Sequence, residues 1–542
     1  MYTTRTPGIP SISGYADKPK CQKHKSHKRS KKLSAKDMVD EKPDVQGIYW
    51  SRFQTTREQA REVRRRTYRN HINMEENNPT LKQEKENFGT PAFKVSFQSA
   101  TSPRLPYTSE RYFRFKEMKT KYKPQIRHYQ LHHNLSASSS NAVFYYRYPE
   151  SVYMNPATGQ LQHNIKWGIM CVNPIADTEM SAMDASKIHD KDAPRVDDIT
   201  TLSAANGVIV AGDMQGIYGF KSLATSFESE ITTGTIVPTH TFEDTSTNHV
   251  HTILGRRSGL PQAVFTSNDK IIRVLDCHTN RWLGKHKFRN PVNCSCTSPD
   301  GRLRLLVSDD ATPLVANAET GEILAELPGH TDHGFACAWA PDGITMATGH
   351  QDGVVQIWDA RKMTKAIHSI PAEMGGVRAL EFSPLGSGKP VLALAESSDF
   401  VSIVDANTFQ SKQTIEFFGE IVGITMSPDG SSLFIGNSDP TYGGITEFER
   451  TANSSVHSQR RPRTRRVRDI DDSGDTADHV RMEDVDRYGD ADMARNFSRA
   501  CSPWSEHYSD WFVDAELEMN AKTVRTRAHR WRRNMGLGGL LL

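Results

Sequence analysis

The second half of the chain repeats two sequence landmarks at intervals of forty-odd residues. One landmark is a proline in a polar turn, with steps of 42, 43 and 44 residues between its copies: Pro299, Pro341, Pro384 and Pro428. The other is a polar residue that ends an apolar run, with steps of 41, 42 and 46 residues: Asp276, Asn317, Asp359 and Asp405. Because the spacing of both landmarks increases in parallel along the chain, we expect the chain to repeat one structural unit of this size.

Each unit has the pattern of four short strands. In the clearest unit the apolar runs GFACAWA, ITMATGH, VVQIWDA and KAIHSI follow one another, and the turns PDG and QDG lie between the first three. Four strands in roughly 40–45 residues is the size of one blade of a β-propeller. A ring of blades also leaves only short sheet edges exposed to other chains. We therefore predict an all-β fold, a β-propeller.

The number of units predicts seven blades, although the first unit is weak and a six-bladed ring stays open. The units lie near residues 126–165, 195–240, 247–288, 290–328, 331–373, 375–418 and 420–450. The last unit ends after its third strand, ITEFER, so its outer strand has to come from elsewhere. The segment RYFRFK, Arg111 to Lys116, lies just before the first unit and is the predicted donor. Such pairing would close the ring.

Residues 327–361 resemble a WD40 repeat. They contain a Gly-His pair at 329–330, an aspartate in a turn and a Trp-Asp pair at 358–359. The resemblance implies a hydrogen-bonded tetrad of His330, Thr348, Asp352 and Trp358. Because a buried histidine and aspartate must be paired, this constellation has a structural explanation before a catalytic one.

Several strings together resemble an uncharacterised family of fungal and plant transducin-like WD-repeat proteins. The strings lie at residues 44–71, 111–115, 329–343, 375–384, 395–405, 417–429 and 442–450. The resemblance implies a seven-bladed propeller preceded by a short helical motif, and it implies no reaction. Residues 1–43 and 452–542 fall outside it.

The net charge of +4 conceals a strong asymmetry along the chain. Residues 1–125 hold 28 Lys and Arg against 13 Asp and Glu, whereas the remaining residues hold 40 against 51. A basic extension on an acidic body indicates an acidic partner, and a solvated tail without a specific partner is the alternative. The predicted organisation is a disordered basic arm at 1–53, a basic helix at 54–72, a linker at 73–107, the propeller at 108–451 and a charged tail at 452–542. A helical pattern near residues 510–533 ends this tail.

Two basic clusters flank the predicted propeller and are candidate nuclear-import signals. The first comprises Lys23, Lys25, Lys28, Arg29, Lys31 and Lys32, and the second comprises Arg460, Arg461, Arg463, Arg465 and Arg466. Neither cluster is interleaved with aromatic residues for base stacking. Any contact with nucleic acid is therefore expected to be non-specific.

The stretch 55–71 has the composition of a helix that is cationic over most of its surface. Thr55 and Glu58 have the spacing of a capping box, and Ala60 and Val63 give a thin apolar stripe. One interpretation is a helix that docks into the acidic groove of a partner. The other is a helix packed against the acidic rim of its own propeller.

The sequence contains no motif that argues for catalysis or for a cofactor. It has no P-loop, no dinucleotide-binding glycine pattern, no nucleophile elbow and no zinc-protease helix. Cys294 and Cys296 are interpreted as core thiols, and the histidines at 128, 132 and 133 are not supported as metal ligands. We predict a non-enzymatic, monomeric scaffold that binds other proteins.

Seven cysteines without paired spacing fit a reducing compartment. The chain has no apolar run of membrane-spanning length and no secretory signal at its start. Nucleus or cytoplasm is the predicted location.

The string WDAR gives the sharpest functional hypothesis. Asp359 and Arg361 match the WD-x-R pattern of propellers that serve as substrate receptors of cullin-4 ubiquitin ligases. That resemblance implies that Arg361 contacts the ligase's adaptor at the propeller rim. The corresponding positions in two other units, His278 and Asn407, lack the arginine, and an arginine here can also simply pair with a carboxylate of a neighbouring blade.

Overall fold

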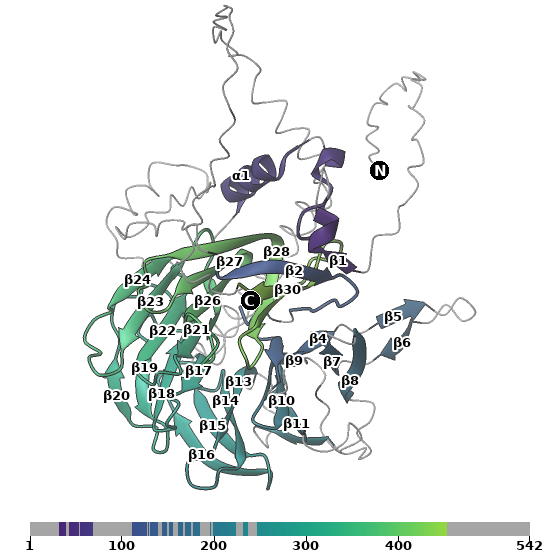
Figure 1. The fold of residues 1–542 in the computed structure, drawn as a ribbon. Coiled ribbons are helices and arrows are strands. Elements are labelled where there is room, and N and C mark those ends of the chain that lie inside the picture. The colour runs from purple at the N-terminus through teal and green to yellow at the C-terminus, as the bar shows by residue number, and fades with distance from the viewer. Residues whose placement is uncertain are drawn as a thin grey trace, which may run out of the picture.

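The computed structural model describes residues 32–38, 43–53, 55–68, 111–126, 128, 130–138, 144–148, 151–154, 161–165, 168–174, 177–184, 196, 199–223, 231–236 and 246–451. Within these residues the strands form seven four-stranded blades arranged as a ring (Figure 1). This confirms the predicted all-β propeller. None of the helices in the described part is long and apolar enough to cross a membrane.

The first four blades run in sequence order around the ring. Blade 1 consists of β3 (Leu135–Ala137), β4 (Phe144–Tyr148), β7 (Gly168–Asn173) and β8 (Thr178–Asp184). Blade 2 consists of β9 (Ile199–Ala205), β10 (Val208–Asp213), β11 (Ile217–Ser222) and β12 (Thr232–Thr235). Blade 3 consists of β13 (Thr247–Leu254), β14 (Pro261–Ser267), β15 (Ile271–Asp276) and β16 (Arg281–Lys287). Blade 4 consists of β17 (Val292–Thr297), β18 (Leu303–Ser308), β19 (Leu314–Asn317) and β20 (Ile323–Glu326).

The last three blades complete the ring, and one long strand serves two of them. Blade 5 consists of β21 (Gly334–Trp339), β22 (Thr345–His350), β23 (Val354–Asp359) and β24 (His368–Pro371). Blade 6 consists of β25 (Val377–Phe382), β26 (Val391–Glu396), β27 (Ser398–Asp405) and the first half of β28 (Lys412–Met426). Blade 7 consists of the second half of β28, β29 (Ser432–Asn437), β30 (Gly444–Arg450) and β2 (Phe113–Lys119).

Ring closure uses the strand that the sequence indicated. β2 pairs antiparallel with β30, so that Phe113 lies opposite Arg450. Phe113 and Met118 are fully buried. The side chain of Gln413 makes two hydrogen bonds to the backbone of Phe113: its Oε1 accepts the N–H at 3.0 Å and its Nε2 donates to the carbonyl at 2.7 Å. The outer strand of the last blade therefore comes from the segment that precedes the first blade, as predicted.

The first blade differs from the expected unit at 126–165. The run SVYMN was assigned to the blade, but β5 (Ser151–Met154) pairs with β6 (Leu161–Ile165) in a separate hairpin. Strand β7 takes its place beside β4. The reason is apolar content, because β7 contributes Ile169 and Cys171 to the core that blade 1 shares with blade 2.

Apolar side chains between successive blades form the core of the ring. The cluster between blades 5 and 6 is typical: Ile357 of β23 and Leu392 of β26 are both fully buried within it. The first strands of successive blades are neighbours in space around the whole ring, and β28 in turn lies beside β3. Face-to-face packing of this kind makes each blade depend on its two neighbours.

The N-terminal segment is folded in part, which corrects the prediction of a disordered arm at 1–53. β1 (Lys32–Ser34) adds a fifth strand outside β2 and is followed by the short helix η1 (Ala35–Met38). The short helix η2 (Trp50–Phe53) and the helix α1 (Arg57–Thr67) come next. The cause is apolar anchoring, since Leu33 and Ile48 are buried. The linker 73–107 and residues 452–542 lie outside the described residues.

Candidate interaction surfaces of the ring

The predicted tetrad residues form one hydrogen-bonded chain inside blade 5. His330 Nδ1 lies 2.9 Å from Asp352 Oδ2, and His330 Nε2 lies 2.9 Å from Thr348 Oγ1. The indole Nε1 of Trp358 donates to the same Thr348 oxygen at 2.9 Å. Trp358 is fully buried and the other three side chains are buried or nearly so. The chain of bonds joins strands β22 and β23, the turn between them and the loop before the blade, so these polar atoms serve the fold.

Electrostatics support the same assignment. Burial acts to raise the pKa of Asp352, but the hydrogen bond and the charge of His330 outweigh it and hold that pKa below its ordinary value. Burial also holds the pKa of His350 well below its ordinary value, and the ring of His350 stacks on His330 at 3.5 Å between centroids. Both ring nitrogens of His330 are bonded within the blade, so His330 has no nitrogen left for a substrate among these contacts, whereas His350 Nε2 is buried without a hydrogen-bond partner among the described residues.

Arg361 lies on the surface immediately after β23. Its Nε and Nη2 donate to the two carboxylate oxygens of Asp359 at 3.0 and 2.6 Å, and its backbone N–H donates to the same side chain at 2.8 Å. The hydrogen bond from Arg361 lowers the pKa of Asp359 to about 2. The side chain of Arg361 is 71 % exposed. The arginine is therefore oriented by its own repeat, not by a carboxylate of a neighbouring blade.

The strand order places Arg361 at a defined end of the ring. We call this end the turn face; it carries the first-to-second and third-to-fourth strand turns, including those at 255–260, 298–302, 340–344, 360–367 and 383–390. The opposite end, which we call the helix face, carries the second-to-third turns and the connections between blades. Alternation of antiparallel strands makes these two ends distinct.

One comparison with known protein families covers the part of the chain that runs from the end of blade 4 through β23 of blade 5. The family model "WD domain, G-beta repeat" matches residues 321–359. This is a WD40-repeat protein. The narrower resemblance to the fungal and plant transducin-like proteins stays a prediction.

Individual relatives match only parts of this WD40 chain. The small ribosomal subunit protein RACK1 of Schizosaccharomyces pombe is 32% identical over 131 residues, which is 22% of this chain and 40% of that protein. The WD repeat domain-containing protein 83 of Homo sapiens is 30% identical over 97 residues, 18% of this chain and 30% of that protein. The nuclear distribution protein PAC1 of Arthroderma benhamiae is 32% identical over 163 residues, 28% of this chain and 35% of that protein. The chain thus spans well under half the length of each of these relatives.

One solved structure is also similar to this WD40 chain. A chain of the crystal structure of the mitotic checkpoint complex has a TM-score of 0.46 and 16% identity, and the match covers 65% of this chain and 98% of that one.

Helix α1 of the WD40 protein begins one residue later than the sequence indicated. Its N-cap is Thr56, whose side chain accepts from the backbone N–H of Gln59, while the Gln59 side chain accepts from the N–H of Thr56. The predicted capping pair, Thr55 with Glu58, is therefore wrong by one residue. Thr56 and Gln59 satisfy the same capping-box rule as the predicted pair, so the sequence alone allows the helix to begin at either threonine.

The arginines of α1 face acidic groups of the WD40 ring. Arg61 Nη1 lies 2.9 Å from Asp399 Oδ2, and Arg64 Nε lies 2.9 Å from the same oxygen. Arg57 Nη1 lies 2.8 Å from Glu416 Oε2. The helix thus packs on the acidic rim of its own ring, which is the second of the two interpretations considered.

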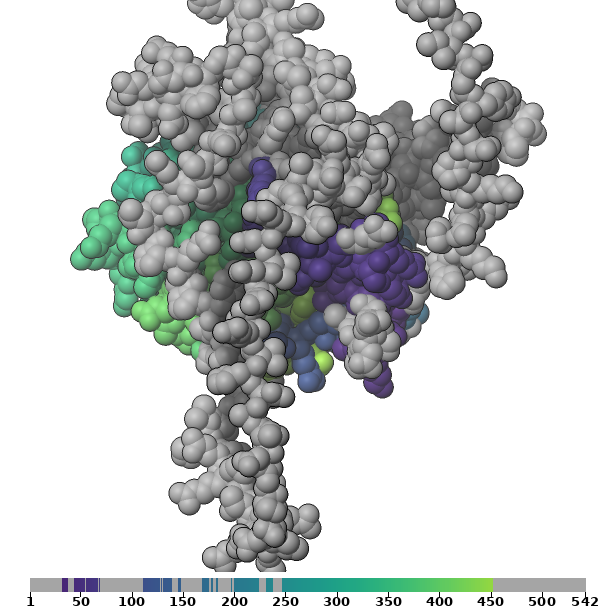
Figure 2. Space-filling view, turned by 90° about the horizontal axis from the view of Figure 1, so that it is seen from above, coloured from purple at the N-terminus to yellow at the C-terminus, as the bar shows by residue number. Residues whose placement is uncertain are grey.

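The N-terminal segment covers part of the helix face. Figure 2 shows its described residues, in purple, lying against strands of the C-terminal blades in green and yellow. The Trp50 and Phe418 rings are 5.0 Å apart, and Gln46 Nε2 donates to the Phe418 carbonyl at 2.9 Å. Lys32, assigned above to an import cluster, forms an ion pair with Glu117 at 2.6 Å. The other import residues lie outside the described part of the chain.

Sequence reasoning missed the acidic partners of α1. Asp399 and Glu416 are more than 330 residues away from the arginines they contact, and no motif marks them. Asp399 is fully buried beneath the helix. The excess of acid over base in the body of the chain was the available signal, and it predicts an acidic rim without naming the residues.

Proposed function

We propose that this protein is a non-enzymatic WD40 scaffold that binds other proteins through its turn face, acting in the nucleus or the cytoplasm as a monomeric ring. One observation carries the proposal. The helix face is partly occupied by the chain's own N-terminal segment, whereas the turn face exposes large apolar side chains on the same end of the ring as Arg361. The proposal needs no cofactor.

The large exposed apolar residues of the turn face lie on three blades, and Ile367, 49% exposed in the 360–367 turn of blade 5, is one of them. Leu254 and Leu260 flank the turn of blade 3 with exposures of 53% and 40%, and Leu385 in blade 6 is 77% exposed. Arg361 of blade 5 lies on the same face. Leucine and arginine side chains presented on turns of a rigid ring require little ordering when a partner binds. Such a surface suits recognition of a folded protein or of an extended peptide.

Affinity purification with quantitative mass spectrometry tests the scaffold proposal. The test variant carries Leu254→Ser, Leu260→Ser and Leu385→Ser, and the matched control carries Leu283→Ser, Ile323→Ser and Leu324→Ser on the exposed outer strands of blades 3 and 4. We expect stoichiometric partners of the wild type to be lost by the first variant and kept by the second. Equal recovery by both variants would count against the turn face.

We propose as a second candidate that the protein is a substrate receptor of a cullin-4 ubiquitin ligase. The observation in its favour is the geometry of Arg361, which is exposed, oriented by Asp359 and placed at the rim. Arg302 is the matched control because it lies on the same face, is 68% exposed and pairs with Asp300 at 3.6 Å. Arg361→Ala is expected to abolish co-precipitation of the ligase's adaptor, and Arg302→Ala to leave it unchanged. An unchanged pull-down with Arg361→Ala ends this candidate.

We propose that the basic clusters contribute to nuclear import, with any nucleic-acid contact limited to non-specific charge attraction. Alanine substitution of Lys23, Lys25, Lys28 and Arg29, and separately of Arg460 and Arg461, is expected to lower the nuclear fraction of a fluorescent fusion. Imaging of the two variants beside the wild type measures this fraction. Identical distributions would remove both clusters from the proposal.

A further inference from the structure

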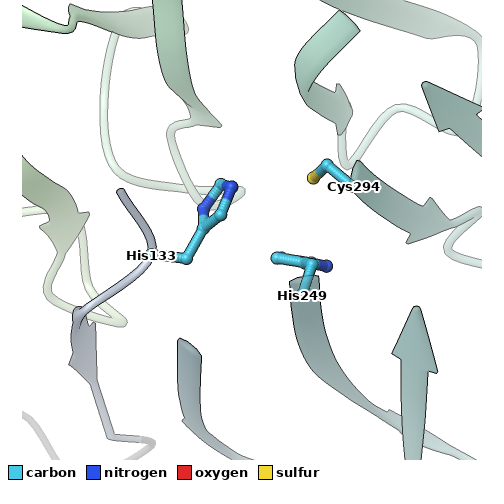
Figure 3. Close-up of side chains that lie close together, drawn as sticks. All are labelled: His133, His249 and Cys294. Atoms are coloured by element: carbon cyan, nitrogen blue, oxygen red, sulfur yellow. The ribbon is translucent and has the colours of Figure 1, made fainter. Parts of the chain in front are cut away.

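Three potential metal ligands from distant parts of the sequence meet inside the ring. His133 directly precedes β3 of blade 1, His249 lies in β13 of blade 3, and Cys294 lies in β17 of blade 4. Their ligand atoms all lie within 4.8 Å of one another. Figure 3 shows the three side chains around one common space, with the imidazole of His133 facing Cys294 and His249. These strands are the first strands of their blades, so the group lies where the blades converge.

The two histidines have nitrogen atoms that the protein does not use. His133 Nε2 and His249 Nδ1 are buried atoms without a hydrogen-bond partner among the described residues. The two rings meet edge to face, with centroids 4.5 Å apart. In this arrangement neither ring donates an N–H hydrogen bond to a nitrogen of the other. Buried polar nitrogen without a partner is unfavourable, and a neutral imidazole has one lone pair to offer. A bound cation would take up one imidazole lone pair from each ring.

The three side chains differ in their exposure to solvent. Cys294 is 2% exposed, while both histidines are only half-buried. The thiol therefore lies at the closed end of the group and the imidazoles lie nearer to solvent.

We propose that His133, His249 and Cys294 bind a transition-metal ion of the zinc class. Two imidazoles and a thiolate suit Zn²⁺ better than hard cations such as Mg²⁺ or Ca²⁺, which prefer oxygen ligands. Metal–ligand bonds of about 2.0–2.3 Å in a tetrahedral site place ligand atoms roughly 3.3–3.8 Å apart. The group therefore has to contract by about 1.5 Å at most, which side-chain rotation supplies.

The site would have three protein ligands and one open position. The neighbouring thiol of Cys337 lies 3.8 Å from Cys294 Sγ but is outside the group of three. The fourth position is consequently left to water or to a side chain of a partner. Because the ligands come from blades 1, 3 and 4, the ion would join blade 1 to blades 3 and 4, which are not its neighbours around the ring. Metal binding is therefore expected to stabilise the whole ring.

Spectroscopic titration of the full-length protein with Co²⁺ tests the site. The protein is purified with a reductant and freed of metal by a chelator, and Co²⁺ is then added. We expect one equivalent of Co²⁺ to give the sulfur-to-cobalt charge-transfer absorption and the strong visible bands of a tetrahedral thiolate site. Added Zn²⁺ should abolish both signals by displacement.

Matched variants separate this site from other cysteines and from misfolding. Cys294→Ser should abolish the charge-transfer absorption, whereas Cys277→Ser, which removes another buried free thiol, should keep it. His133→Gln and His249→Gln should each weaken Co²⁺ binding by more than about 100-fold, since loss of even an outer-shell partner costs 10–100-fold. Thermal melts of the metal-free variants check that each one folds.

The same variants provide a second readout that does not need cobalt. Zn²⁺ should raise the Tm of the wild type and of Cys277→Ser, and should leave the Tm of His133→Gln and His249→Gln unchanged. The proposal is overturned by the absence of a one-to-one Co²⁺ signal in the wild type. It is also overturned if folded His133→Gln and His249→Gln bind as the wild type does.

Discussion

At the residue scale, Trp358 joins the polar chain of blade 5 to the apolar core. Its ring is fully buried beside Cys294 and Met346, while its Nε1 donates to Thr348. Trp358→Ala is expected to lower the free energy of unfolding by roughly 3–5 kcal/mol, as loss of a large buried aromatic does. Trp358→Phe keeps most of the packing and loses the hydrogen bond, so it should cost less. Denaturant melts measure both, and an Ala variant as stable as the wild type would contradict the blade register.

Glu381 is a second residue whose burial has a measurable consequence. It lies in β25, and its Oε1 accepts the backbone N–H of Met426 at 3.0 Å. Burial raises the pKa of Glu381 from its ordinary value of 4.5 to about 8. A carboxyl whose pKa is higher in the folded state stabilises the fold below its unfolded pKa. That contribution is lost as the pH rises from about 4.5 to about 8.

The variant Glu381→Gln isolates this effect, because glutamine keeps the acceptor for Met426 and does not titrate. Relative to Glu381→Gln, the wild type is expected to lose stability progressively between pH 5 and pH 8. The comparison is necessary because burial lowers the pKa of His128 to about 4, which gives a trend of opposite sign. Thermal melts of both proteins across this range make the measurement. A constant difference in Tm from pH 5 to pH 9 would contradict the raised pKa.

At the scale of elements, α1 is held by charge and by aromatic faces together. The guanidinium of Arg61 contacts Asp399 and also lies 4.2 Å from the centroid of the Phe418 ring. Arg61→Ala leaves Arg64 as the one remaining cationic partner of buried Asp399 among the described residues, so a loss of roughly 2–4 kcal/mol from the attachment of the helix is expected. Hydrogen exchange measured by mass spectrometry should show faster exchange over residues 57–67.

Arg66 provides the matched control for this helix. Its side chain is 75% exposed and pairs only with Glu62, one turn earlier, among the contacts that the structure shows. Arg66→Ala is therefore expected to change stability by no more than about 0.5 kcal/mol. If Arg66→Ala and Arg61→Ala accelerate exchange equally, the charge contacts with the rim do not hold the helix.

The elements also show which parts of the structure can be predicted from local sequence patterns. The strands of blades 3 to 7 were predictable because each is short, apolar and bounded by turn residues. The cap of α1 was missed by one residue because Thr55 and Thr56 both fit the same rule. The hairpin of β5 and β6 was missed because pairing partners depend on the core that each strand joins. The group of His133, His249 and Cys294 was missed because its spacing in sequence carries no metal-binding pattern.

At the scale of the whole molecule, the ring depends on a strand that is distant in sequence from its neighbour. β2 supplies Phe113 and Met118, both fully buried, to blade 7. Burial of these two side chains contributes roughly 3–6 kcal/mol. The donor was predictable because blade 7 visibly lacked an outer strand and one apolar run lay unassigned before blade 1. The fifth strand, β1, was not predictable, since Lys32 and its neighbours have the composition of a solvated tail.

Circular permutation tests this closure directly, because the ends of β30 and β2 are adjacent. Phe113 lies opposite Arg450, and the N–H of Thr451 donates to the Tyr112 carbonyl at 3.0 Å. A chain of residues 126–451 continued through a short turn into residues 111–125 should therefore form a four-stranded blade 7 within one hairpin. Its reference is residues 126–451 alone, which lack β2, and both chains lack α1. The free energy of unfolding of the permuted chain is expected to be higher than that of the reference by at least about 3 kcal/mol, so the permuted chain should unfold at a higher denaturant concentration. Equal midpoints would show that β2 is an accessory strand and that the ring holds together without it.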